Sequence, residues 1–93
     1  MERRVVITGL GVVSPVGTGV EKFWNSLLEG KSGIAPITRF DAADFPVKIA
    51  GEVKDFDPAL AGDKKTIRHM DRNAQFAVAA ARMAVEDAKL DME

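Results

Sequence analysis

Residues 5–17 constrain the fold more than any other part of the chain, because they combine a run of β-branched residues with two glycines and a proline. Val5, Val6 and Ile7 are adjacent, so a strand here would carry apolar side chains on both of its faces. Such a strand is typical of the centre of a mostly parallel α/β sheet. We therefore predict a central strand, which Pro15 ends because proline cannot donate to the ladder.

Gly9 and Gly11 interrupt this predicted strand. Glycine inside a strand indicates that another backbone comes close or that the strand bulges.

An amphipathic helix is predicted directly after the strand, over residues 20–28, so that the two elements open a βα unit. Its apolar positions recur with helical spacing at Val20, Phe23, Trp24, Leu27 and Leu28. Thr18 and Glu21 have the spacing of a capping box at its start, and Gly30 supplies a left-handed stop at its end.

The middle of the chain is expected to be less regular. Residues 34–44 contain Pro36 and read as an irregular segment, with Ile37, Phe40 and Phe45 packing it onto the core. Alternation of apolar and charged residues then predicts a half-exposed strand around 47–54, as an edge or a separate ribbon.

Three aspartates have the positions of helix N-caps. Asp57 precedes a proline at the first helical position, and Asp63 precedes a short helical piece. Asp71 precedes the longest element, a helix over residues 72–89 that is rich in alanine and apolar around nearly its whole circumference. A helix of that kind is normally buried on several sides.

These elements need more covering layers than 93 residues supply, since a domain of this size buries only about 60–70% of its unfolded surface. We infer that the chain is a piece of a larger α/β protein or is covered by a partner. The alternative is a complete small domain with an alanine-rich surface helix.

Composition excludes several classes of function. A net charge of −1 argues against a nucleic-acid binder, and the absence of cysteine excludes a disulfide scaffold and a cysteine nucleophile within the chain. One histidine leaves no multi-histidine metal site, and Asp55 and Asp57 are interpreted as turn and capping residues. No secretory signal or membrane span is apparent, so a soluble, cytoplasmic protein is expected.

The sequence resembles the opening of the β-ketoacyl-acyl-carrier-protein synthases, the condensing enzymes of fatty-acid synthesis, and the type II enzymes more than type I. The matching motifs run collinearly through the chain at residues 3–17, Phe23-Trp24, 28–34, Arg39-Phe40-Asp41, 51–56 and 68–71. The resemblance implies an α/β fold, the thiolase-like αβαβα layered architecture, of which residues 1–93 would be the start of the N-terminal half without an internal boundary. It also implies that the long alanine-rich helix is one of the buried central ones.

The chemistry that the resemblance implies is acyl transfer to a cysteine, followed by decarboxylative condensation with malonyl-acyl carrier protein. Two histidines and backbone amides assist that reaction in the family. The chain has no cysteine, and His69 matches neither catalytic histidine, so the 93-residue chain alone is predicted to be an inactive part of this acyltransferase. No cofactor is expected. The family resemblance implies that this chain packs against the remainder of the synthase chain and that the full enzyme is a homodimer.

The resemblance further implies a carrier-docking surface. In the family, a basic patch receives the acidic helix of the acyl carrier protein, and the matching positions are Lys64, Lys65, Arg68 and His69. The pairs 64/68 and 65/69 have i, i+4 spacing, so the four side chains are predicted to fan from one side of a helix. The simpler interpretation is a solvated helix face with ordinary basic residues.

Of three other functions that the sequence suggests, the first is disfavoured and the other two remain open. A dinucleotide-binding unit is suggested by Gly9-x-Gly11, but the third position of that fingerprint is Ser14 and no suitably placed acidic residue follows. A non-catalytic subunit of the same family, such as a chain-length factor, would share all these residues. A stand-alone module that binds acidic proteins would share the basic patch alone.

Overall fold

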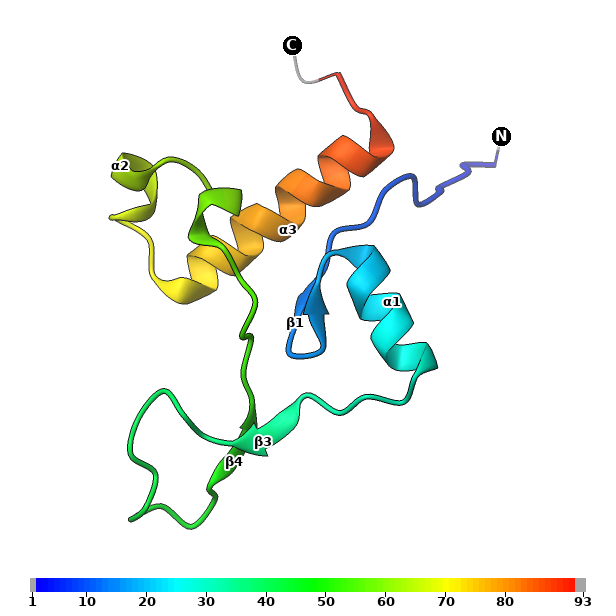
Figure 1. Ribbon diagram of the computed structural model, residues 1–93. Helices are drawn as coiled ribbons and strands as arrows, with labels where there is room; N and C mark the ends of the chain where they lie inside the picture. Colours follow the sequence, from blue (N-terminus) through cyan, green and yellow to red (C-terminus); the bar gives the residue numbers. More distant parts are fainter. Residues whose placement is uncertain (1, 92–93) are drawn as a thin grey trace. The chain divides into compact units, whose positions relative to one another are not determined.

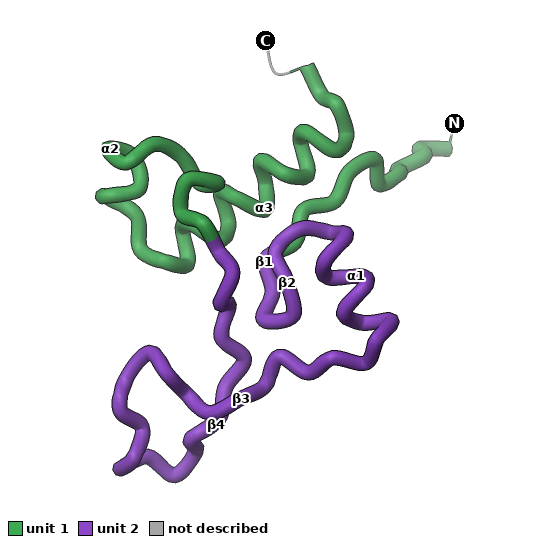
Figure 2. Tube along the Cα trace, in the orientation of Figure 1, with its two compact units in different colours: residues 1–12, 57–93 green, residues 13–56 purple. Residues whose placement is uncertain are grey.

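The computed structural model describes residues 2–91 as a mixed α/β chain with short elements. In chain order these are β1 (Val13–Ser14), β2 (Gly17–Thr18), α1 (Val20–Leu28), β3 (Ile34–Pro36), β4 (Ile49–Gly51), the 3₁₀ turn η1 (Pro58–Leu60), α2 (Lys64–Ile67) and α3 (Arg72–Ala88) (Figure 1). They form two compact units (Figure 2). Unit 1 combines Met1–Val12 with Asp57–Glu93, and unit 2 is Val13–Phe56.

The three predicted N-caps of unit 1 are confirmed. Asp57 accepts a hydrogen bond from the backbone N–H of Ala59 at 3.0 Å. The carboxylates of Asp63 and Asp71 each accept from the N–H three residues on, both at 2.8 Å. Each cap satisfies a donor that has no partner inside its helix, which is why α2 and α3 begin where they do.

The predicted central strand at the start of the chain is not formed. Residues 2–12 have no ladder partner among the described residues, and β1 covers only Val13–Ser14. Val5 and Ile7 are 92% and 84% exposed. The prediction was wrong for this reason: a strand exists only when a second strand pairs with it, and the described residues provide none at this place.

Close backbone approach at the two glycines is confirmed, and the partner is α3. A Cβ atom at Gly9 would lie 2.7 Å from the Cβ of Ala88, and one at Gly11 would lie 2.9 Å from the backbone nitrogen of Ala84. The N–H of Leu10, between them, donates to the Asp87 carboxylate at 3.0 Å. The extended segment therefore lies directly on the alanine side of α3.

α3 is only partly covered by unit 1. Ala79 is 1% exposed, whereas Ala77 and Ala81 are exposed. The helix ends at Lys89, whose φ of 56° is left-handed, and the N–H of Leu90 returns to the Val85 carbonyl at 3.2 Å.

Unit 2 contains two antiparallel pairs. β1 pairs with β2 through Val13↔Thr18, and β3 pairs with β4 through Ile34↔Gly51, Ala35↔Ala50 and Pro36↔Ile49. The predicted ribbon around 47–54 is confirmed as β4, although it is shorter than expected. The expectation that 34–44 is irregular throughout was wrong, because its first three residues pair with β4.

Helix α1 has the predicted extent and end, but a different start. Gly19, with a φ of 99°, is its N-cap and no side chain caps it, so the predicted capping box of Thr18 and Glu21 was wrong. At the other end Gly30 has a φ of 72°, and the N–H of Lys31 bonds the Ser26 carbonyl at 3.0 Å. This pairing closes the helix as a Schellman motif.

The two phenylalanines of the β3–β4 connection do not pack into a core as predicted. Phe40 and Phe45 are 56% and 53% exposed and contact each other edge to face, with ring centroids 5.7 Å apart. In the described residues the buried hydrophobic side chains are those of Ala42, Ala61 and Ala79. Small cores of this kind leave the larger apolar side chains on the surface, as the inference of a larger protein requires.

Replacing Gly11 with alanine is expected to destabilise the intact protein by about 1–3 kcal/mol, because the added methyl group meets the backbone of α3 at Ala80 and Ala84. Urea unfolding would measure the loss. Thr8→Ala, at an exposed neighbouring position, is the control and should stay within about 0.5 kcal/mol. Equal stability of both variants would contradict the close approach.

Candidate functional site

The four basic residues predicted as a docking surface lie together around α2, and all four are exposed. We call Lys64, Lys65, Arg68 and His69 the cationic cluster. The N–H of Arg68 bonds the Lys64 carbonyl at 3.2 Å, so the pair 64/68 has the expected helical geometry. His69 bonds the Thr66 carbonyl instead, at 3.3 Å, because the helix tightens into a 3₁₀ turn there. The pair 65/69 therefore departs from the predicted i, i+4 arrangement.

The charges of the cationic cluster are available to a partner. The ion pairs of Lys22 with Asp55, Lys31 with Glu29 and Lys54 with Glu52 lie outside the cluster. The nearest carboxylates in the sequence, Asp63 and Asp71, are engaged in capping backbone N–H groups. Exposed cations of this kind attract an acidic surface, and added salt screens this attraction so that it acts over a shorter distance.

The carboxylate that starts α2 favours its ionised form. The backbone N–H of Thr66 bonds Asp63 and is the main reason that the Asp63 pKa lies below its ordinary value; the Thr66 hydroxyl and the Lys65 N–H act in the same direction. Asp63 thus keeps the single turn of α2 formed under neutral conditions, and this turn positions Lys64, Lys65 and Arg68 on the surface.

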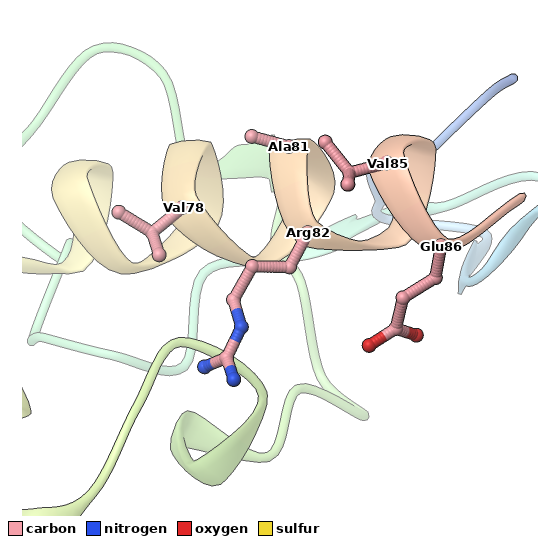
Figure 3. Close-up of a pocket in the computed structure, with 5 residues that line it drawn as sticks. All are labelled: Val78, Ala81, Arg82, Val85 and Glu86. Atoms are coloured by element: carbon pink, nitrogen blue, oxygen red, sulfur yellow. The ribbon is translucent and has the colours of Figure 1, made fainter. Parts of the chain in front are cut away.

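A hollow of about 370 Å³ lies along α3 and is mostly apolar. It is lined by Val78, Ala81, Arg82, Val85 and Glu86, and the charged groups of Arg82 and Glu86 extend from the same side of the helix (Figure 3). A second hollow of about 160 Å³ lies between η1 and α3, and Arg82 and Glu86 border it as well. The sequence singled out neither residue as a site, although an Arg–Glu pair four residues apart on an alanine-rich helix is a readable signal.

Two acidic residues contribute contacts that sequence reasoning missed. Asp57 is a cap, as interpreted, but Asp55 instead binds Thr18 and Lys22 from a distance in sequence. Glu52, which the sequence analysis treated only as a charged position of the predicted ribbon, binds Thr38 and Arg39. No local pattern indicates such contacts, because each joins segments at least 13 residues apart.

The residue types of the chain limit the sites that it can form. The sequence has no cysteine and one histidine, which excludes a thiolate–histidine pair. Among residues 2–91, no three His, Asp or Glu side chains are grouped closely enough to hold a metal ion. In the same part of the chain, no helix is long and apolar enough to cross a membrane.

Comparison with known proteins gives one consistent result. The family described as beta-ketoacyl synthase, N-terminal domain, matches residues 2–93. A 3-oxoacyl-[acyl-carrier-protein] synthase 2 of Coxiella burnetii is 60% identical over 91 residues, which are 98% of this chain and 22% of that protein. The protein of the same name from Synechocystis is 49% identical over 89 residues, 96% of this chain and 21% of that one.

The solved structure of the ishigamide ketosynthase/chain length factor superposes on the chain with a TM-score of 0.87 at 50% identity. The match covers 98% of this chain and 23% of that one. The chain thus spans about a fifth of the length of the relatives that it matches.

Replacing Asp63 with alanine is expected to unwind the turn of α2 that carries the cationic cluster, seen as faster hydrogen exchange of the Thr66 amide. Asp63→Asn keeps an acceptor and should preserve most of the protection. Because the folded pKa of Asp63 is lowered, protection is complete above the ordinary carboxyl value of 3.8 and is lost as the pH falls through the lower folded value. Equal exchange in both variants would contradict this role.

Proposed function

The chain belongs to the β-ketoacyl synthase family, as an N-terminal part of its thiolase-like fold, and from this we propose that it forms part of a condensing enzyme of fatty-acid elongation. In the proposed reaction an acyl group is transferred to a cysteine and condensed with malonyl-acyl carrier protein, giving 3-oxoacyl-acyl carrier protein and CO2. The single observation that carries the proposal is the match of residues 2–93 to the family together with 60% identity to a 3-oxoacyl-[acyl-carrier-protein] synthase 2.

Residues 1–93 contribute structure and recognition, not catalysis, in this proposal. The sequence has no cysteine to take the acyl group, so the nucleophile belongs to another part of the enzyme. The extended segment at Val5–Ile7 and the open side of α3 supply apolar surface against which further layers of the fold can pack. On the family resemblance, we include in the proposal a cytoplasmic homodimer that needs no cofactor.

The cationic cluster is proposed as part of the surface that receives the acyl carrier protein. The relatives' names specify an acyl-carrier-protein substrate, and the cluster presents three fixed positive charges and one imidazole without ion-pair partners among the described residues. Electrostatic complementarity of this kind mainly accelerates encounter and fixes orientation.

A second candidate is a non-catalytic subunit of the same family. It is favoured by one observation, the likeness to the solved structure of the ishigamide ketosynthase/chain length factor. Residues 1–93 are compatible with either function, since neither requires a nucleophile in this part of the sequence.

An activity assay separates the two candidates. The longer protein that carries this chain is expected to release CO2 from malonyl-acyl carrier protein and to form 3-oxoacyl-acyl carrier protein, detected by mass spectrometry. The 93-residue chain alone should form none, because it has no cysteine. Absence of product from the longer protein, with an acyl-loaded carrier present, would exclude the condensing enzyme and support the non-catalytic subunit.

Reversing charge in the cationic cluster is expected to weaken carrier binding. Lys65→Glu and Arg68→Glu together should raise the Kd of the longer protein for acyl carrier protein about tenfold at low salt, and the difference should shrink at high salt. Lys31→Glu is the matched control, because Lys31 is an exposed lysine in unit 2 that pairs with nearby Glu29. Unchanged affinity at low salt, or an equal loss in the control, would rule out docking at this surface.

A further inference from the structure

Glu52 lies just after β4 and collects several hydrogen bonds from the β3–β4 connection. The backbone N–H groups of Thr38 and Arg39 each donate to one of its oxygens at 3.1 Å, and the Thr38 hydroxyl donates to the other at 2.8 Å. The ammonium group of Lys54 lies 4.0 Å away. Only 9% of the Glu52 side chain is exposed, so these partners replace nearly all of its water.

Asp55, three residues later, makes a comparable set of contacts with a different segment. Its carboxylate accepts from the hydroxyl of Thr18 at 3.1 Å and from the N–H of Thr18 at 3.4 Å. The ammonium group of Lys22, in the first turns of α1, donates to it at 3.3 Å. Asp55 therefore binds the start of α1 where the capping box was predicted.

The spacing of the two carboxylates explains how they reach different partners. Side chains an odd number of positions apart on an extended segment point to opposite sides. Residues 52–54 are not helical, so Glu52 and Asp55 can contact the β3–β4 connection and the start of α1 respectively. Both contacts lie within unit 2.

Lys48, the residue before β4, contacts both the base and the far part of the β3–β4 connection. The N–H of Ile37 bonds the Lys48 carbonyl at 2.9 Å, and the Lys48 ammonium group donates to the carbonyls of Ala43 and Phe45 at 3.0 and 2.7 Å. This lysine holds the loop in shape, whereas Glu52 joins Thr38 and Arg39, near the start of the loop, to the segment after β4. Loss of the Glu52 contacts would free Thr38 and Arg39, while the Lys48 contacts would keep the rest of the loop folded.

We propose that residues 52–55 form a carboxylate strap, in which ionised Glu52 and Asp55 hold the β3–β4 loop and the start of α1, and which opens when the carboxylates are protonated. A protonated carboxyl group keeps only part of its capacity to accept, and it loses its attraction for Lys22 and Lys54. The strap is thus a conformational device of unit 2 and does not depend on the proposed enzymatic function.

The ionisation of both groups agrees with this arrangement. The Thr38 hydroxyl is the main reason that the pKa of Glu52 is lowered, and the Thr38 and Arg39 N–H groups add to it. Partial burial raises the pKa of Asp55, but bonds from Thr18 and Lys22 outweigh it and leave it lowered. The strap is therefore fully closed above the ordinary values of 4.5 and 3.8, and it opens as the pH falls through the lower folded values.

Amide hydrogen exchange in the intact protein tests the strap. In Glu52→Gln, protection of the Thr38 and Arg39 amides is expected to fall about tenfold at neutral pH, while that of Thr18 stays unchanged. In Asp55→Asn, protection of the Thr18 amide should fall instead. Glu29→Gln, which breaks only an exposed ion pair with Lys31, is the control and should affect none of these amides.

A pH series gives an independent readout. Wild-type protection of the Thr38 and Arg39 amides should fall as the pH drops below the ordinary glutamate value of 4.5, and in Glu52→Gln it should show no such pH dependence. If Glu52→Gln unfolds the protein, Thr38→Val replaces it as the test, because it removes only the hydroxyl donor to Glu52. Protection of the Arg39 amide is then expected to fall in part. The proposal would be overturned if amide protection stayed unchanged in the folded variants or fell equally in the control. It would also be overturned if protection in the wild type did not depend on pH.

Discussion

Uncovered apolar surface is the constraint on which the rest of the structure depends. The buried hydrophobic side chains of the described residues are those of alanines, while Val5, Trp24 and Leu28 are 92%, 57% and 68% exposed. With so little hydrophobic burial, other interactions must define each unit. In unit 1 these are glycine–alanine backbone contacts and aspartate caps, and in unit 2 they are carboxylates that bind backbone amides. Both sets are directional, so they fix local geometry without supplying a core.

The sequence predicted best where structure depends on neighbouring residues. The caps at Asp57, Asp63 and Asp71 and the left-handed end of α1 at Gly30 are all determined within a few positions. The extent of α1 and the family resemblance were also correct, since both rest on patterns spread over many residues. The residues of the cationic cluster are exposed, but their role in docking stays a prediction, and His69 follows a tighter turn than i, i+4 spacing implies.

The errors arise where distant segments compete with local ones. Thr18 could have capped α1, but its hydroxyl bonds Asp55, 37 residues away, and Gly19 takes the N-cap position. Residues 5–7 have the composition of a central strand, yet the described residues contain no strand to pair with them. They therefore do not form a strand despite their high β-propensity. Glu52 carried no signal at all, because a carboxylate beside a strand is ordinary until the fold brings two amide groups to it.

The two acidic side chains of the carboxylate strap also set rules for changing the length of the chain. An inserted residue near Pro46 would extend an exposed stretch of loop and leave every amide–carboxylate contact in place. An inserted residue between Glu52 and Asp55 would rotate one carboxylate to the opposite side of the backbone and separate it from its donors. The loop tip is therefore a suitable place to graft a foreign peptide or a label, whereas the short stretch after β4 behaves as a spacer of fixed length.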